Sequence, residues 1–232
     1  MEFGFIPSEF EVLGNDEKKE NIILCRRALV PQNIPDNVVF IAKEKASASD
    51  FVQMMTIFDD AFKNIQANFV VLALGEFDIS KTEKRLKVNT KTQEFDFFLE
   101  QKQSKEMALN SVNALTEIIR EICPMGKIVS VDPLSRVSAG HHNSAVDFIR
   151  KRVAQVDEKH THISTWSRFQ RDSRRKKFNN VNFPVNEDAF VAEGQPTAIE
   201  IENIISAALV AMRQEEGEDK VVVGDVTFKK LF

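Results

Sequence analysis

A chain of 232 residues in which 43% are hydrophobic and 28% are charged has the composition of a globular protein with one sizeable core. No apolar run approaches the ~18 residues that cross a bilayer, and the start, Met1 to Ser8, lacks the basic and apolar parts of a signal peptide, so a cytoplasmic protein is expected. The net charge of −4 argues against a general nucleic-acid binder. The two cysteines, Cys25 and Cys123, make neither a disulfide framework nor a zinc site, and they are expected to be buried as small hydrophobes.

Along the chain, residues 1–19 mix Pro7, Gly14 and a charged cluster, which is typical of an N-terminal arm. Short apolar runs predict strands at residues 21–25, 37–42, 68–74 and 127–131, and residues 160–166 are interpreted as a fifth strand. Helical spacing of apolar residues predicts helices at 50–62, 108–122, 146–153 and 196–212. Residues 79–104 fit a hairpin or a helix start. After the domain, at 20–212, residues 213–232 form an acidic linker and an apolar tail.

Strands that alternate with helices predict an α/β fold with a parallel, doubly wound sheet. The number and order of the strands favour a flavodoxin-like three-layer α/β/α sandwich with five parallel strands. The third strand is the one around which this fold is organised. Its apolar run stops at Gly75 and two carboxylates, Glu76 and Asp78, so a buried strand is expected to end at a polar crevice. Ligands of open α/β sheets bind outside such strand ends.

The block Gly75-Glu76-Phe77-Asp78 resembles the third conserved block, Gly-x-Asn-Asp, of the SGNH (GDSL-type) hydrolases. Further anchors for this resemblance are Ile22-Ile23-Leu24, residues 39–50 and Glu193-Gly194 before the final helix. The likeness spans roughly residues 20–212. It implies a three-layer sandwich of SGNH type.

The resemblance also implies that the catalytic groups of the family are replaced in this chain. Its nucleophilic serine is matched by Arg27, its oxyanion-hole glycine by Lys45 and its block-three asparagine by Phe77. The last block, Asp-x-x-His, is matched by Asn186 and Ala189. A guanidinium stays protonated and cannot attack a carbonyl, so the prediction is a pseudoenzyme without catalytic residues, cofactor or metal. It is comparable to the SGNH-like domain of the germ-plasm protein Oskar, which also lacks the catalytic residues and binds RNA.

Basic residues follow three of the predicted strands and should therefore emerge at one carboxyl edge of the sheet. Residues 168–177 alone hold six basic residues and one acidic residue. We expect RNA binding, in the cytoplasm or in ribonucleoprotein granules, through Arg26, Arg27, Lys43, Lys45, Arg168, Arg171, Arg174, Arg175, Lys176 and Lys177. Trp166, Phe169 and Phe178 are candidate platforms for stacked bases. The alternative interpretation is a solvated basic loop balanced by neighbouring carboxylates.

Two other functions stay open. A protein adaptor without RNA binding would use the Met54, Met55, Phe58 and Phe62 stripe or the tail 221–232 to bind a partner. An atypical hydrolase would use relocated residues, and the candidates are Ser47, Ser49, Asp78, Asp132, His141 and His142. The paired histidines with these carboxylates also raise the question of a metal site.

Overall fold

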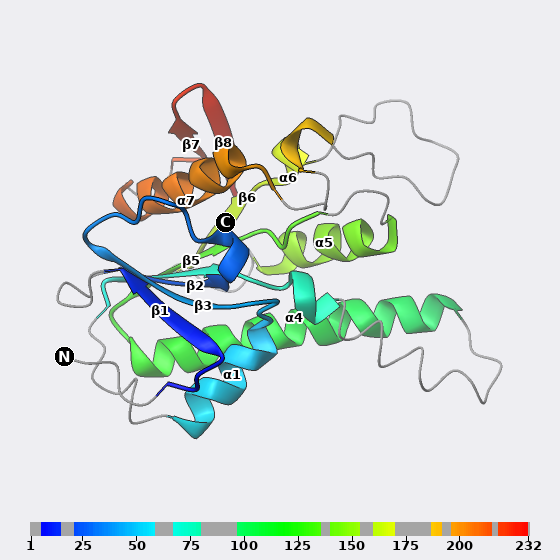
Figure 1. Ribbon diagram of the computed structural model, residues 1–232. Helices are drawn as coiled ribbons and strands as arrows, with labels where there is room; N and C mark the ends of the chain where they lie inside the picture. The colour runs from blue at the N-terminus through cyan, green and yellow to red at the C-terminus, as the bar shows by residue number, and fades with distance from the viewer. Residues whose placement is uncertain are drawn as a thin grey trace.

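The computed structural model describes residues 6–14, 21–58, 67–79, 97–135, 140–153, 160–169, 187–191, 196–214 and 218–231. These residues form one sheet with helices on both faces (Figure 1). The α/β class predicted from the sequence is confirmed.

All five predicted strands exist and lie side by side in the centre of the sheet. They are β2 (Asn21–Arg26), β3 (Val38–Lys43), β4 (Phe69–Ala73), β5 (Lys127–Val131) and β6 (His160–Ser164). They pair in parallel in the order β3-β2-β4-β5-β6. Strands β2, β3, β4 and β5 are mainly apolar because a strand covered on both faces has no solvent-facing side, whereas β6 consists mostly of polar residues.

The sheet is larger than the five parallel strands predicted, because three antiparallel strands extend it to eight among the described residues. One is β1 (Phe10–Gly14), which pairs with β3 and comes from the stretch predicted as an N-terminal arm. The other two, β7 (Lys220–Val223) and β8 (Val226–Leu231), come from the predicted C-terminal tail. They form a hairpin in which β8 pairs with β6 and β7 lies at the edge.

Two apolar cores lie on the two faces of the sheet. Alternate residues of β2 show the division, since Ile22 and Leu24 join one core whereas Ile23 and Cys25 join the other. The first core is covered by α1 (Ala48–Ile57), α4 (Phe97–Ile122) and α5 (Gly140–Val153). The second is covered by α7 (Ala198–Arg213) (Figure 1).

Three helix predictions change in detail. The helix predicted at 50–62 is α1, which begins at Ala48, and Met54 and Met55 are buried in the core, so they are not a docking surface. The open question at 79–104 resolves in part, because α4 begins at Phe97. The helix predicted at 146–153 is α5, which begins at Gly140 and therefore includes His141 and His142. None of the described helices is long and apolar enough to cross a membrane.

Candidate functional site

The site expected in a doubly wound sheet lies where the strand order reverses, here between β2 and β4. Both strands end at the carboxyl edge, and a narrow pocket opens there. Its lining includes Arg26, Leu29, Glu76, Phe77, Asp132, Leu134 and Ile204. This pocket is therefore the first candidate for a ligand-binding or catalytic site.

A buried ion pair occupies this pocket. Arg26, the last residue of β2, places Nη1 2.8 Å from Oε2 of Glu76, which follows β4. Their side chains are only 6% and 10% exposed. Since a buried charge without its partner is costly, Glu76 holds Arg26 in the interior. We therefore withdraw Arg26 from the predicted RNA surface.

The residue that matches the nucleophile, Arg27, begins the short helix η1 (Arg27–Leu29). Its Nε donates to Oε2 of Glu11 on β1 at 2.9 Å, and the two side chains are 45% and 54% exposed. An exposed pair of this kind is weak, worth roughly 0–1 kcal/mol. Arg27 therefore lies on the surface with a replaceable partner.

Lys43 ends β3 and is held by several groups at once. Its Nζ donates to Oε1 of Glu9 at 2.9 Å, lies 3.5 Å from Oδ1 of Asp50, and sits 5.1 Å from the centre of the Phe10 ring. Burial acts to lower the pKa of Lys43, but the hydrogen bond that it donates to Glu9 and the charge of Asp50 raise the pKa above its ordinary value. Lys45, two residues on, is exposed.

The block after β4 shapes the start of α1. Gly75 has φ +105°, a conformation that favours glycine, and Pro133 packs against it. The buried carboxylate of Asp78 accepts from the backbone N–H groups of Ala48 at 2.7 Å and Ser49 at 3.1 Å. Ser47 caps the same helix by accepting from the N–H of Asp50. Ser47 and Asp78 are thus capping groups of α1.

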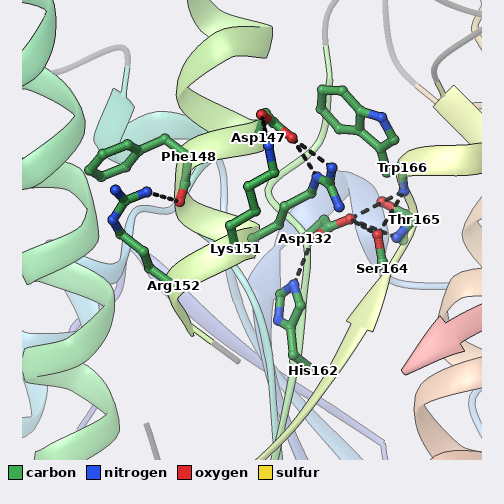
Figure 2. Close-up of polar contacts among 10 residues, drawn as sticks. Asp132, Asp147, Phe148, Lys151, Arg152, His162, Ser164, Thr165 and Trp166 are labelled. Carbon is green, nitrogen blue, oxygen red and sulfur yellow. Dashed lines mark hydrogen bonds and ion pairs between the residues drawn. The ribbon is translucent and has the colours of Figure 1, made fainter. Parts of the chain in front are cut away.

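A polar network lies between β5 and β6 (Figure 2). Asp132 accepts from Nε2 of His162 at 2.6 Å, from the hydroxyl of Ser164 at 2.8 Å and from the backbone N–H groups of Thr165 and Trp166. Behind His162, the Ser130 hydroxyl lies 2.7 Å from His162 Nδ1 and 2.6 Å from His160 Nε2. Sequence reasoning missed Ser130, His160 and His162. The His-x-His alternation on one strand was the available signal, because it places both rings on one face.

The donors and acceptors in this network have a definite order. A carboxylate only accepts, so His162 donates to Asp132 through Nε2–H, and its Nδ1 then accepts from the Ser130 hydroxyl. The Ser130 oxygen is left to accept from Nε2–H of His160. Although this is a serine–histidine–aspartate chain, Ser130, His162 and Asp132 are at most 2% exposed. The network therefore joins β5, β6 and the start of α6 (Trp166–Phe169) in the interior.

Among the relocated candidates considered from the sequence, Asp78 contacts the backbone of Ser49, and the His141 side chain lies outside the described residues. Asp78 caps α1, Asp132 binds His162, and Nε2 of His142 lies 2.9 Å from the Leu134 carbonyl oxygen. Among the described residues, no group of three or more histidine, cysteine, aspartate or glutamate side chains is placed to hold a metal ion.

The beginning of the basic stretch is anchored to α7. Arg168 contacts both carboxylate oxygens of the buried Glu200, which lies in the first turn of α7. Phe169 is fully buried and packs on Phe190 with ring centres 5.1 Å apart. The Arg150 guanidinium covers the Trp166 ring at 4.6 Å. Arg168 and Phe169 are therefore structural, and the Trp166 platform is occupied by an arginine.

The remaining predicted site residues divide into two groups. Phe77 lines the pocket at the switch point, and Ala189 is buried in the short helix η3 (Glu187–Ala189). The others lie outside the described residues; they are Arg171, Arg174, Arg175, Lys176, Lys177, Phe178 and Asn186.

The sequence matches no protein-family model and no curated protein.

Proposed function

We propose that this chain is a non-catalytic binding module on an SGNH-like frame, and that its ligand is RNA. The order of the parallel strands, β3-β2-β4-β5-β6, supports the frame, because it is the flavodoxin-like order 2-1-3-4-5 when only these strands are numbered. The antiparallel strands β1, β7 and β8 then count as additions at the two edges.

The observation that carries the proposal is the buried Arg26–Glu76 ion pair at the switch point. The side chains of this pair and the ring of Phe77 line the place where a catalytic α/β domain would hold its substrate. The neighbouring Arg27, at the nucleophile position, supplies no nucleophile. A ligand would then bind on the outer surface of the carboxyl edge.

RNA is the ligand class that this outer surface favours. Arg27 and Lys45 are exposed there, and Arg27 and Lys43 each pair with an exposed glutamate, Glu11 and Glu9. Because exposed ion pairs are weak, phosphate groups can replace these carboxylates. The cations at 171–177 follow β6 and α6 along the chain and give this stretch of sequence a positive charge. We propose contacts from these groups, in the cytoplasm or in ribonucleoprotein granules.

The test is fluorescence anisotropy of the full chain with a labelled single-stranded RNA at several salt concentrations. We expect binding that weakens log-linearly with salt, with a slope of about −0.7 for each phosphate contacted. Replacing Arg171, Arg174 and Arg175 together by glutamate should abolish binding. As a control, Arg213→Glu at the far end of α7 should change affinity little, because Arg213 is exposed and away from this edge.

Absence of binding at low salt, or unchanged binding by the triple variant, would contradict the RNA proposal. The non-catalytic part has its own test. Turnover of p-nitrophenyl acetate by the purified chain, lost in Ser47→Ala or His142→Ala, would replace it with a hydrolase.

One observation favours a second candidate, a protein adaptor. Strand β7 lies at one end of the described sheet, and its Val222 side chain is 58% exposed. An extended segment of a partner can add to such an edge as a further strand. Val222→Lys should then remove the partner in a pull-down, and Thr227→Lys on the neighbouring strand β8 is the matched control.

A further inference from the structure

Strand β1 carries acidic side chains onto the basic edge of the sheet. It runs antiparallel to β3 with Phe10 opposite Lys43 and Glu11 opposite Ala42. Phe10 fixes this position because it is buried and packs edge-on against Phe51, with ring centres 5.2 Å apart. The flanking glutamates, Glu9 and Glu11, therefore stay beside the ends of β3 and β2.

Both glutamates contact cations that the proposed function assigns to RNA. Glu9 accepts from Nζ of Lys43 and Glu11 accepts from Nε of Arg27, each at 2.9 Å. The glutamate side chains are 61% and 54% exposed. The carboxylate oxygens thus stand where phosphate oxygens would have to bind, with solvent on their outer side.

We infer that Glu9 and Glu11 act as built-in competitors of RNA phosphate at Lys43 and Arg27, and that they set the affinity of this edge for RNA. The inference rests on the proposed function. A phosphate that reaches either cation must first displace a carboxylate, so part of its favourable interaction is lost in breaking an existing ion pair. Removing the carboxylate charge removes that loss.

The two competitors are not equivalent. Among the described contacts, Arg27 has Glu11 as its acidic partner, so neutralising Glu11 leaves the guanidinium open to phosphate. Lys43 retains Asp50 and the face of Phe10 after Glu9 is neutralised. Asp50 is also fixed by the capping box of α1. Glu11 should therefore limit RNA binding more strongly than Glu9.

The experiment measures RNA anisotropy for Glu11→Gln, Glu9→Gln and the double variant. Glu11→Gln should tighten binding by about 1.4-fold to 5-fold, the range that corresponds to the roughly 0.2–1 kcal/mol of an exposed ion pair. It should also steepen the salt slope by about 0.7, for one added phosphate contact. Glu9→Gln should have the smaller effect. Adding Arg27→Ala to Glu11→Gln should erase the gain.

A matched control separates this contact from a general change in charge. Glu117 and Glu121 are exposed on α4 and lie on another part of the molecule. Replacing both by glutamine removes the same charge as the Glu9 and Glu11 double variant, and it should leave affinity nearly unchanged. Circular dichroism and urea unfolding should show that every variant keeps the fold.

The outcomes distinguish the inference from the function beneath it. If the wild type binds RNA and Glu11→Gln binds no more tightly, the inference is overturned while RNA binding stands. The inference is also overturned if the Glu117 and Glu121 control tightens binding equally, or if the gain survives Arg27→Ala. If neither the wild type nor the double variant binds at low salt, the proposed function itself fails.

Discussion

At the scale of single residues, Asp132 was a candidate catalytic group in the sequence, and in the structure it stabilises the fold. Its carboxylate is buried at the end of β5 and accepts hydrogen bonds from β6 and from the first residues of α6. Hydrogen bonds to an ionised acceptor are stronger than neutral ones. Asp132 therefore holds together the strand ends beneath the proposed binding edge.

Replacing Asp132 by asparagine should be strongly destabilising. The amide turns one acceptor into a donor that faces N–H and O–H groups, which leaves buried donors unsatisfied. We expect the free energy of unfolding in urea to fall by about 2–4 kcal/mol. Asp147→Asn is the control, because Asp147 pairs with Arg150 and Lys151 near the surface (Figure 2) and should cost less than about 1 kcal/mol. Equal losses in the two variants would refute the assigned role of Asp132.

Cys25 behaves as its apolar surroundings predict. Burial raises the pKa of its thiol to about 12, although the charges of Arg26 and Arg27 act in the opposite direction. Because the thiolate is the reactive form, Cys25 stays protonated and inert at neutral pH. The sequence-based interpretation of both cysteines as small buried hydrophobes is confirmed by their burial.

At the scale of elements, the segment after β4 controls how α1 begins. Gly75 turns the chain at φ +105°, and this turn leads to Asp78, which caps the N-terminus of α1. Gly75 and Asp78 together thus bring the segment after β4 into contact with the start of α1. The block Gly75–Asp78 therefore has a structural role at the end of β4 and the start of α1.

The turn at Gly75 gives a matched pair of glycine substitutions. A Cβ on Gly75 would lie 2.8 Å from Cγ of Pro133, whereas a Cβ on Gly224, in the β7–β8 turn at φ +54°, meets nothing within 4 Å. We expect Gly224→Ala to cost about 1 kcal/mol, from the left-handed backbone alone. Gly75→Ala should cost about 3 kcal/mol, because a clash adds to the strain. Thermal unfolding measures both, and similar melting temperatures would contradict the contact with Pro133.

At the scale of the whole molecule, the C-terminal residues belong to the folded domain. Strand β8 pairs with β6, and Val221 and Phe228 of the hairpin are fully buried against α7. From the sequence this segment was expected to be a tail that could bind a partner. It forms two strands of the same sheet, and β7 lies at the edge.

This placement predicts that the hairpin contributes to global stability. Phe228→Ala removes a fully buried ring and should lower the free energy of unfolding by about 3–5 kcal/mol. Thr227→Ala, next to it on the exposed side of β8, should change stability by less than about 0.5 kcal/mol. Urea titration of both variants checks this. A Phe228→Ala protein as stable as the wild type would mean that the hairpin is not part of the core.

The sequence by itself determined the α/β class, the five parallel strands and the burial of Cys25. Each of these depends on local composition, because a contiguous apolar run forms a buried strand wherever it lies in the sheet. It also located the polar strand ends at Gly75 and Asp132. Edge strands such as β1 escaped this reasoning, since Phe10–Gly14 has no continuous apolar run.

Only the tertiary structure decided which basic side chains pair with carboxylates. Arg27, Lys43 and Arg168 take partners that lie 16, 34 and 32 residues away in the chain, namely Glu11, Glu9 and Glu200. The burial of Arg26 with Glu76 likewise follows from the order of β2 and β4. A run of basic residues shows where positive charge lies along the chain. The electrostatic potential at the surface also depends on which carboxylates the fold places beside those residues. That placement is set by strand register and sheet order, which no local pattern contains.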